Sequence, residues 1–369
     1  MEIKVERNRF LESLSLASNV VSAKATLPIL NNVLIETDKE KNKIVITGTD
    51  LEIGVIVKCD AQILEGGSIT IPAKKLFEII RELPEGEIDL NAGKNTTIAI
   101  KTKKTLFKIS GLEPTDFPTL PKPTSEKTFE IDQNLLKECL STTSFAASRD
   151  EARYTLNGVL VILKDNLIKF VATDGKRLAL VERKINTPKG SAFEAILPTK
   201  TINELLKTLS GTGNVKITHS QNQILFEQEN ITVSSRLIEG KFPNYEQVIP
   251  KEEKTTAKVE RSGLLGAVKR MSLLTSQENQ SVKLDFTKGK ILVSARTPNL
   301  GEAKEELDAE ISGEDLTIGF NPAYLVEVLK NMTSDAVMLS LSGQDKPGLL
   351  KETKDYLYLY VVMPMQLTY

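Results

Sequence analysis

The sequence predicts an α+β protein that consists of three tandem domains of similar architecture. Segments in which apolar and polar residues alternate, typical of half-buried antiparallel strands, surround a smaller number of amphipathic helical segments. Similar motifs return at a spacing of about 125 residues. The 369 residues are enough for two or three domains that each bury a core of their own.

The three copies begin alike, with a short strand followed by an amphipathic helix. The matching stretches are "MEIKVERNRFLESLSLASNV", "KTFEIDQNLLKECLSTTSFA" and "TAKVERSGLLGAVKRMSLLT". In the second stretch, Leu135, Leu136, Cys139, Leu140 and Thr143 follow the spacing of one helix face. In the first copy we expect this helix over residues 7–22.

The copies also share a unit made of a strand, a turn and a second strand. The stretch "ITGTDLEIGVIV" at 46–57 resembles "FVATDGKRLALVE" at 170–182. Asp50 and Asp174, which stand at the turns, are 124 residues apart. A strand pattern follows each turn, so the stretch around Gly175 lacks the helix N-terminus that a phosphate loop requires.

A later strand and helix recur as "SITIPAKKLFEIIRELPEG", "AILPTKTINELLKTLSG" and "LTIGFNPAYLVEVLKNM". In the first copy this helix is expected over residues 73–82. Phe117-Pro118 returns 125 residues later as Phe242-Pro243. Each domain should therefore hold two helices and about eight strands, with the helices packed on one face of antiparallel sheet.

Two polar, Pro- and Lys-containing stretches suggest linkers between the domains. They are "LPKPTSEK" at 120–127 and "IPKEEKTT" at 249–256. We therefore expect domains at residues 1–124, 125–253 and 254–369.

The inventory of chemically active residues is small. The chain has one histidine, His219, and two isolated cysteines, Cys59 and Cys139, so a zinc site or a Ser/His or Cys/His nucleophile pair is not expected. We expect no metal and no cofactor. The charged N-terminus and the lack of a long apolar run predict a cytoplasmic protein without a membrane segment.

The expected helices carry more positive than negative charge. They hold 12 basic and 7 acidic residues, Arg149 and Asp132 included, in a chain with a net charge of −1. Such an excess is typical either of solvated helix faces or of a surface that attracts a phosphate backbone without reading bases. The charge alone leaves both interpretations open.

Six stretches together resemble the bacterial sliding clamp family, the beta subunit of DNA polymerase III. They are "TLPILNNVLIE", "TGTDLEI", "RYTLNGVL", "ATDGKRLA", "KFPNYEQVIP" and the terminal "YVVMPM". The resemblance covers essentially the whole chain, with three domains in register.

The resemblance implies a non-catalytic processivity factor. In this family, two chains of three clamp domains close head to tail into a ring around duplex DNA, with sheets outside and helices lining the hole. The implied partners are a second copy of the chain, double-stranded DNA without sequence preference, the polymerase III catalytic subunit, the clamp loader, and replication and repair proteins with short clamp-binding motifs.

The resemblance also implies a hydrophobic cleft for partner peptides between domains two and three. The matching positions are Leu156, Thr173, Gly175, Lys176, Arg177, Leu178, Pro243, Gln247, Val248, Val361, Val362, Met363, Pro364 and Met365. Taken alone, "VVMPM" also fits a plain last strand. Gln247 stands where the family often has a basic residue, and Lys176 where it often has histidine or tyrosine, which affects the expected motif preference.

Two further sets of positions follow from the resemblance. Those that match or neighbour DNA-contacting residues are Lys24, Lys74, Arg149, Tyr154, Lys200 and Lys207. Those expected at the ring joint are Phe107 and Ile109 of domain one with Leu273 and Leu274 of domain three, although all four also fit an ordinary core. Asp150 places a negative charge beside the middle-domain loop, and Thr368-Tyr369 extends the usual chain end.

Two other functions compete with the clamp. An enzyme would use Asp50, Asp174 or the Lys176-Arg177 pair to handle phosphate. A repeat scaffold would bind protein partners without DNA.

Overall fold

The computed structural model describes residues 1–22, 27–93, 96–120, 128–188, 191–275, 281–298, 300–353 and 357–367. These residues form two compact units. The first unit comprises Met1–Lys137 with Lys200–Leu237, and the second comprises Glu138–Thr199 with Ile238–Tyr369.

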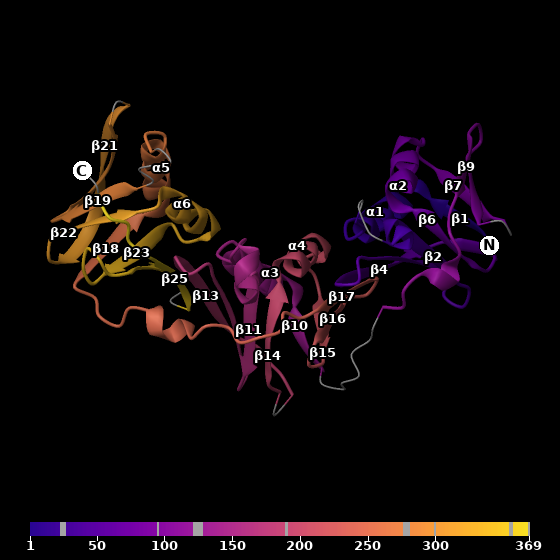
Figure 1. Ribbon diagram of the computed structural model, residues 1–369, viewed down its shortest axis with the longest axis horizontal. Coiled ribbons are helices and arrows are strands. Elements are labelled where there is room, and N and C mark those ends of the chain that lie inside the picture. Colours follow the sequence, from indigo (N-terminus) through magenta and orange to yellow (C-terminus); the bar gives the residue numbers. More distant parts are fainter. Residues whose placement is uncertain are drawn as a thin grey trace. The chain divides into compact units, whose positions relative to one another are not determined.

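The helices and strands repeat three times along the chain (Figure 1). The first copy contains β1 (Glu2–Glu6), α1 (Arg7–Ser18), β2 (Asn32–Asp38), β3 (Lys43–Thr49), β4 (Ile53–Asp60), β5 (Gln62–Glu65), β6 (Ser68–Pro72), α2 (Ala73–Glu82), β7 (Glu87–Ala92), β8 (Thr97–Lys101) and β9 (Leu106–Ser110). The second contains β10 (Thr128–Asp132), α3 (Gln133–Ser144), β11 (Gly158–Lys164), β12 (Leu167–Thr173), β13 (Arg177–Lys184), β14 (Phe193–Pro198), α4 (Thr199–Thr208), β15 (Asn214–His219), β16 (Gln223–Glu227) and β17 (Ile231–Arg236).

The third copy follows the same order of elements. It contains β18 (Thr255–Glu260), α5 (Arg261–Ser272), β19 (Val282–Thr287), β20 (Lys290–Thr297), β21 (Gly301–Gly313), β22 (Leu316–Phe320), α6 (Pro322–Asn331), β23 (Ala336–Leu341), β24 (Gly348–Glu352) and β25 (Tyr358–Val362). Four short 3₁₀ helices lie in the described connections: η1 (Pro28–Asn31), η2 (Pro114–Asp116), η3 (Glu151–Leu156) and η4 (Tyr245–Val248). In the part of the chain that the structure describes, no helix is long and apolar enough to cross a membrane.

Helix α1 shows how the local sequence builds each copy. The Glu6 carboxylate accepts the backbone N–H groups of Asn8 and Arg9, which caps the helix start. Phe10, Leu14 and Ala17 follow at spacings of four and three residues and are fully buried. Figure 1 shows α2 beside α1 in the first copy, and α6 beside α5 in the third.

The predicted helix bounds are confirmed in one case and wrong in the other. Helix α2 spans Ala73–Glu82, as predicted. Helix α1 ends at Ser18, four residues before the expected end at residue 22. The backbone N–H of Val21 turns back to the carbonyl of Ser18, and Val20 is buried, so the chain leaves the helical path there.

The strand order joins neighbouring copies of the repeat. In the first unit one sheet runs β5-β1-β7-β8-β9 and another runs β10-β15-β16-β17-β4-β3-β2-β6. In the second unit the sheet runs β14-β11-β12-β13-β25-β24-β23-β18-β21-β20-β19-β22. We call the antiparallel β4–β17 pair the first joint and the antiparallel β13–β25 pair the second joint.

The substitution Gly48→Ala tests how closely α1 packs on β3. A Cβ atom at Gly48 would lie 1.9 Å from the carbonyl oxygen of Ala17, a backbone atom that has no room to move. Overpacking of this kind costs about 2 kcal/mol. We therefore expect a lower midpoint in thermal unfolding followed by circular dichroism. Gly93→Ala, whose Cβ would meet no described atom within 4 Å, is the control, and equal midpoints would contradict the packing argument.

Candidate functional site

A cavity of about 130 Å³ lies at the second joint. Ten of the predicted cleft residues line it: Leu156, Thr173, Gly175, Lys176, Arg177, Leu178, Pro243, Val248, Val361 and Met363. They come from η3, the turn between β12 and β13, the segment through η4, and β25 with the residue after it. The fold thus gathers positions that are up to 207 residues apart in sequence.

The other four predicted cleft residues are not among the described lining residues. Val362 is fully buried and alternates with Val361 and Met363, so its side chain points to the opposite face of the strand. Gln247 is exposed on η4. The segment of Pro364 and Met365 runs on toward β22, where the Met365 N–H donates to the carbonyl of Gly319 at 2.8 Å.

The cavity has an apolar floor and an apolar rim. Leu156, Leu178 and Val361 are buried in one hydrophobic cluster. At the rim, Val248 and Met363 keep 45% and 40% of their surface exposed. An exposed apolar rim beside a buried floor is typical of a site that docks apolar side chains of a ligand.

One wall of the cavity is the turn between β12 and β13, a strand, turn and strand as the sequence predicts. The Asp174 Oδ1 atom accepts the N–H groups of Lys176 and Arg177 at 2.8 and 3.0 Å. Thr173 Oγ1 donates to the Arg177 carbonyl and accepts the N–H of Gly175. Gly175 has a φ of 84°, a conformation that glycine adopts without steric cost.

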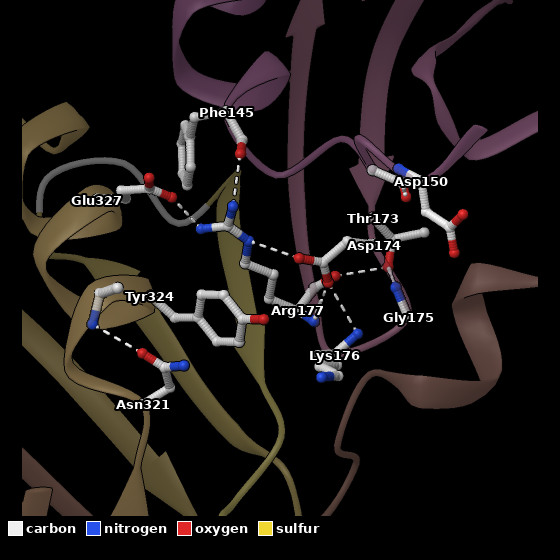
Figure 2. Close-up of polar contacts among 12 residues, drawn as sticks. Phe145, Asp150, Thr173, Asp174, Gly175, Lys176, Arg177, Asn321, Tyr324 and Glu327 are labelled. Atoms are coloured by element: carbon white, nitrogen blue, oxygen red, sulfur yellow. Dashed lines mark hydrogen bonds and ion pairs between the residues drawn. The ribbon is translucent and has the colours of Figure 1, made fainter. Parts of the chain in front are cut away.

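The Arg177 guanidinium ties this wall to helix α6 (Figure 2). It donates to Glu327, to the carbonyl of Phe145 and to Asp174 Oδ2, and it lies 4.5 Å from the centre of the Tyr324 ring. Burial alone would lower the pKa of Arg177, but the hydrogen bond and charge of Glu327, together with the neighbouring Tyr360, outweigh burial and raise the pKa. The guanidinium is therefore fully engaged within the protein and positions the turn.

Sequence reasoning missed three residues at this site. Asn244 and Tyr245 line the cavity, and burial raises the pKa of Tyr245. The signal for Tyr245 was its place in "KFPNYEQVIP", three residues after the repeated phenylalanine. Arg153 donates to the Asp174 carbonyl at 2.8 Å and pairs with Asp150 at 3.0 Å, so the acidic residue beside this loop has a basic partner.

The predicted DNA-contacting residues fall into two groups. Lys24 lies outside the described residues. Lys74 and Arg149 are exposed and make no ion pair with any described residue, and Tyr154 is exposed on η3. By contrast, Lys200 pairs with Asp50, and Lys207 pairs with Glu204 at 2.7 Å.

The observed helix bounds change the charge count. Arg149 and Asp132 lie outside the helices, whereas Arg7 begins α1. The six described α-helices hold 12 basic and 6 acidic residues, an excess of six positive charges. The ammonium groups of Lys74, Lys269 and Lys330 have no hydrogen bond or ion pair to the rest of the described chain, so their charge is available to an external anion.

The four residues expected at the ring joint are all at least partly exposed. Phe107 and Ile109 lie on β9, the edge strand of its sheet, with Phe107 exposed and Ile109 half-buried. Leu273, directly after α5, is 79% exposed, and Leu274 is half-buried. An ordinary core position does not leave a leucine so exposed.

Comparison with known proteins identifies the family along the whole chain. The sequence profiles of the DNA polymerase III beta subunit match with the N-terminal domain over residues 1–121, the central domain over 130–244 and the C-terminal domain over 246–366. The chain is 34% identical over 370 residues to the beta sliding clamp of Pseudomonas putida, with all of both chains covered.

Solved structures give the same result. The sliding clamp of Pseudomonas aeruginosa, solved bound to griselimycin, has a TM-score of 0.96 and 33% identity, with 100% of both chains covered. The sliding clamp of Bartonella birtlesii, also solved bound to griselimycin, has a TM-score of 0.94 and 34% identity over 100% of both chains. The chain therefore belongs to the DNA polymerase III beta subunit family, the bacterial DNA sliding clamps.

Proposed function

We propose that this chain forms a head-to-tail homodimeric ring that encircles duplex DNA and tethers the replicative polymerase. The family is one of non-catalytic processivity factors, so the phosphate-handling enzyme considered from the sequence is excluded. The observation that carries the ring proposal is a pattern of strand pairing between domains. This pattern occurs twice within the chain, and the two strand edges that would form a third instance are unpaired among the described residues.

The rule is that the last strand of one domain pairs with the fourth strand of the domain before it. Strand β17 pairs with β4 at the first joint, and β25 pairs with β13 at the second joint. Strand β9 is the last strand of the first domain, and within the described residues it pairs only with β8. Residues 301–308 of β21, at the fourth-strand position of the third domain, pair only with β20 among the described strands.

These two open edges would satisfy the same rule if they met between two copies. Such a contact is heterologous and generates a closed ring when its rotation allows. It would also cover two strand edges that are otherwise templates for unwanted pairing. The exposed Phe107 and Leu273 supply apolar surface for the contact.

The charges of the two edges are complementary. The β8–β9 hairpin carries Lys101, Lys103, Lys104 and Lys108, none of which forms an ion pair with a described residue. Residues 301–308 carry four acidic residues and one lysine. Glu305 and Glu306 already pair within the chain, which leaves two carboxylates for the lysines of a second copy. Such complementarity favours the head-to-tail orientation over a head-to-head one.

The proposed role of the second-joint cavity is to bind a short apolar segment of a partner. An extended peptide can place one or two apolar side chains on the floor formed by Leu156, Leu178 and Val361. Met363 at the rim is a flexible side chain that adapts to different anchors. We propose the polymerase III catalytic subunit, the clamp loader and repair proteins as partners, and griselimycin as a small ligand of the same cavity.

For DNA, the helices and loops supply a weak and unspecific attraction. Lys74, Arg149 and the excess helix charge can attract phosphates without contacting bases. Topology rather than affinity then retains the ring and allows sliding.

We place the domain boundaries after residues 124 and 253, and the site of action in the cytoplasm.

The ring joint is tested by Leu273→Ala combined with Leu274→Ala. Each truncation removes about 2 kcal/mol of apolar burial if the residue is covered in the dimer. We expect the dimer affinity to fall by at least about a hundredfold, measured by native mass spectrometry across a dilution series. Leu64→Ala, at a leucine of β5 that is 50% exposed, is the control. An unchanged dimer population in the double variant would refute the joint.

The cavity is tested by deletion of residues 363–369. Strand β25 ends at Val362, so the deletion removes the Met363 rim and keeps the β13–β25 ladder. We expect griselimycin binding, followed by calorimetry, to weaken by at least about a hundredfold, since apolar contact supplies most of the affinity. The dimer should persist. The control variant Leu357→Ala, just before β25, should bind griselimycin with normal affinity. Full griselimycin affinity after the deletion would contradict the assignment of the cavity.

A further inference from the structure

The turn that forms one wall of the cavity has a copy at the first joint. Thr49 Oγ1 donates to the Ile53 carbonyl at 2.8 Å and accepts the N–H of Leu51 at 3.0 Å. Asp50 Oδ1 accepts the N–H groups of Glu52 and Ile53 at 3.0 and 2.9 Å. Each bond has its counterpart, 124 residues later, in the Thr173–Arg177 turn.

The strand pairing beside the two turns is also the same. The Arg236 N–H donates to the Glu52 carbonyl at 2.8 Å, as the Met363 N–H donates to the Lys176 carbonyl at 2.9 Å. Gly54 pairs with Ser234 at the first joint. Leu178 pairs with Val361 at the second joint. The first joint therefore has the backbone of the second, with a glycine and a serine in place of two residues of the apolar floor.

The space left at Gly54 is filled by a side chain from the same chain. The Cδ1 and Cδ2 atoms of Leu120 both lie 2.6 Å from the place that a Cβ atom on Gly54 would take. Leu120 follows Phe117 by three residues, just as Tyr245 follows Phe242 at the second joint. Leu120 is half-buried there, so most of its surface is withdrawn from water.

We propose that the first joint is a second peptide site of the same architecture, and that its ligand is the chain's own segment of residues 117–120, anchored by Leu120. The proposal rests on the assignment of the second-joint cavity as a peptide cleft. The ligand class is a short extended peptide with one leucine anchor. A partner peptide can enter the first joint only after Leu120 has left it.

The covalent link explains why the segment keeps partners out. A ligand tethered by a few residues has an effective concentration of about a millimolar or more. A free peptide of similar contact area competes at a concentration far below this effective concentration. The tethered segment therefore keeps the site. The neighbouring residues also differ from the second joint, because Arg236 stands in the place of Met363 and Lys200 pairs with Asp50. The chain therefore offers one open peptide cleft, although the fold builds two.

The first test measures how firmly Leu120 is seated, by maleimide labelling of the full chain. Leu120→Cys places the thiol at the seat, and Thr119→Cys places it at an exposed neighbouring position. A seated thiol reacts only when the segment lifts, so we expect labelling at position 120 to be at least about tenfold slower than at 119. The unchanged chain, with Cys59 and Cys139 both buried, gives the background. Equal rates would overturn the proposal.

The second test asks whether the emptied site takes a peptide in trans. The probe is a synthetic peptide with the sequence of residues 112–120, "LEPTDFPTL", titrated by calorimetry into Leu120→Ala. We expect one more peptide bound per chain than in the unchanged protein, and no increase for a probe that ends in alanine. A folded Leu120→Ala chain without this increase would overturn the proposal.

The two proposals fail separately. Griselimycin binding to the unchanged chain reports on the second joint alone, because Leu120 occupies the first. Loss of griselimycin binding would refute the proposed partner cleft at the second joint. The labelling rates would then still test whether Leu120 occupies the first joint. Normal griselimycin binding together with equal labelling rates would refute only the proposed peptide site at the first joint.

Discussion

The pairing of one domain's last strand with the fourth strand of the domain before it is the constraint on which the rest depends. It extends each sheet across a domain boundary, so the β4–β17 and β13–β25 ladders hold each joint by backbone hydrogen bonds. It places a turn beside each ladder, and at the second joint an apolar floor as well. It also leaves the open edges of β9 and of residues 301–308, which a second copy can complete.

The difference between the two joints comes from a few side chains on a common backbone. At the second joint, Arg177 ties the turn to Glu327 of α6, and the floor stays accessible. At the first joint, Ile53 stands in the place of Arg177, yet the turn makes the same backbone bonds. The arginine is therefore not needed to form the turn, and its role is to fix the turn to the next domain.

Much of the fold followed from the sequence, because repetition at a constant offset reveals domains and register without an alignment. Helix 73–82 and the strand-turn-strand nature of residues 170–180 are confirmed. The gathering of ten cavity residues came from the family resemblance, whereas Val362 was misplaced because strand alternation sends it to the other face. Tyr245 and Arg153 were missed because loop contacts carry no periodic signal.

The most direct test of the central claim is topological retention on DNA. The protein would be loaded on nicked circular duplex by a bacterial clamp loader and washed in moderate salt, and the circle would then be cut. A ring closed by β9 and β21 should remain on circles and leave once they are linear, because it slides off the ends. Protein that stays bound after the cut is held by contact, and that result would contradict the ring.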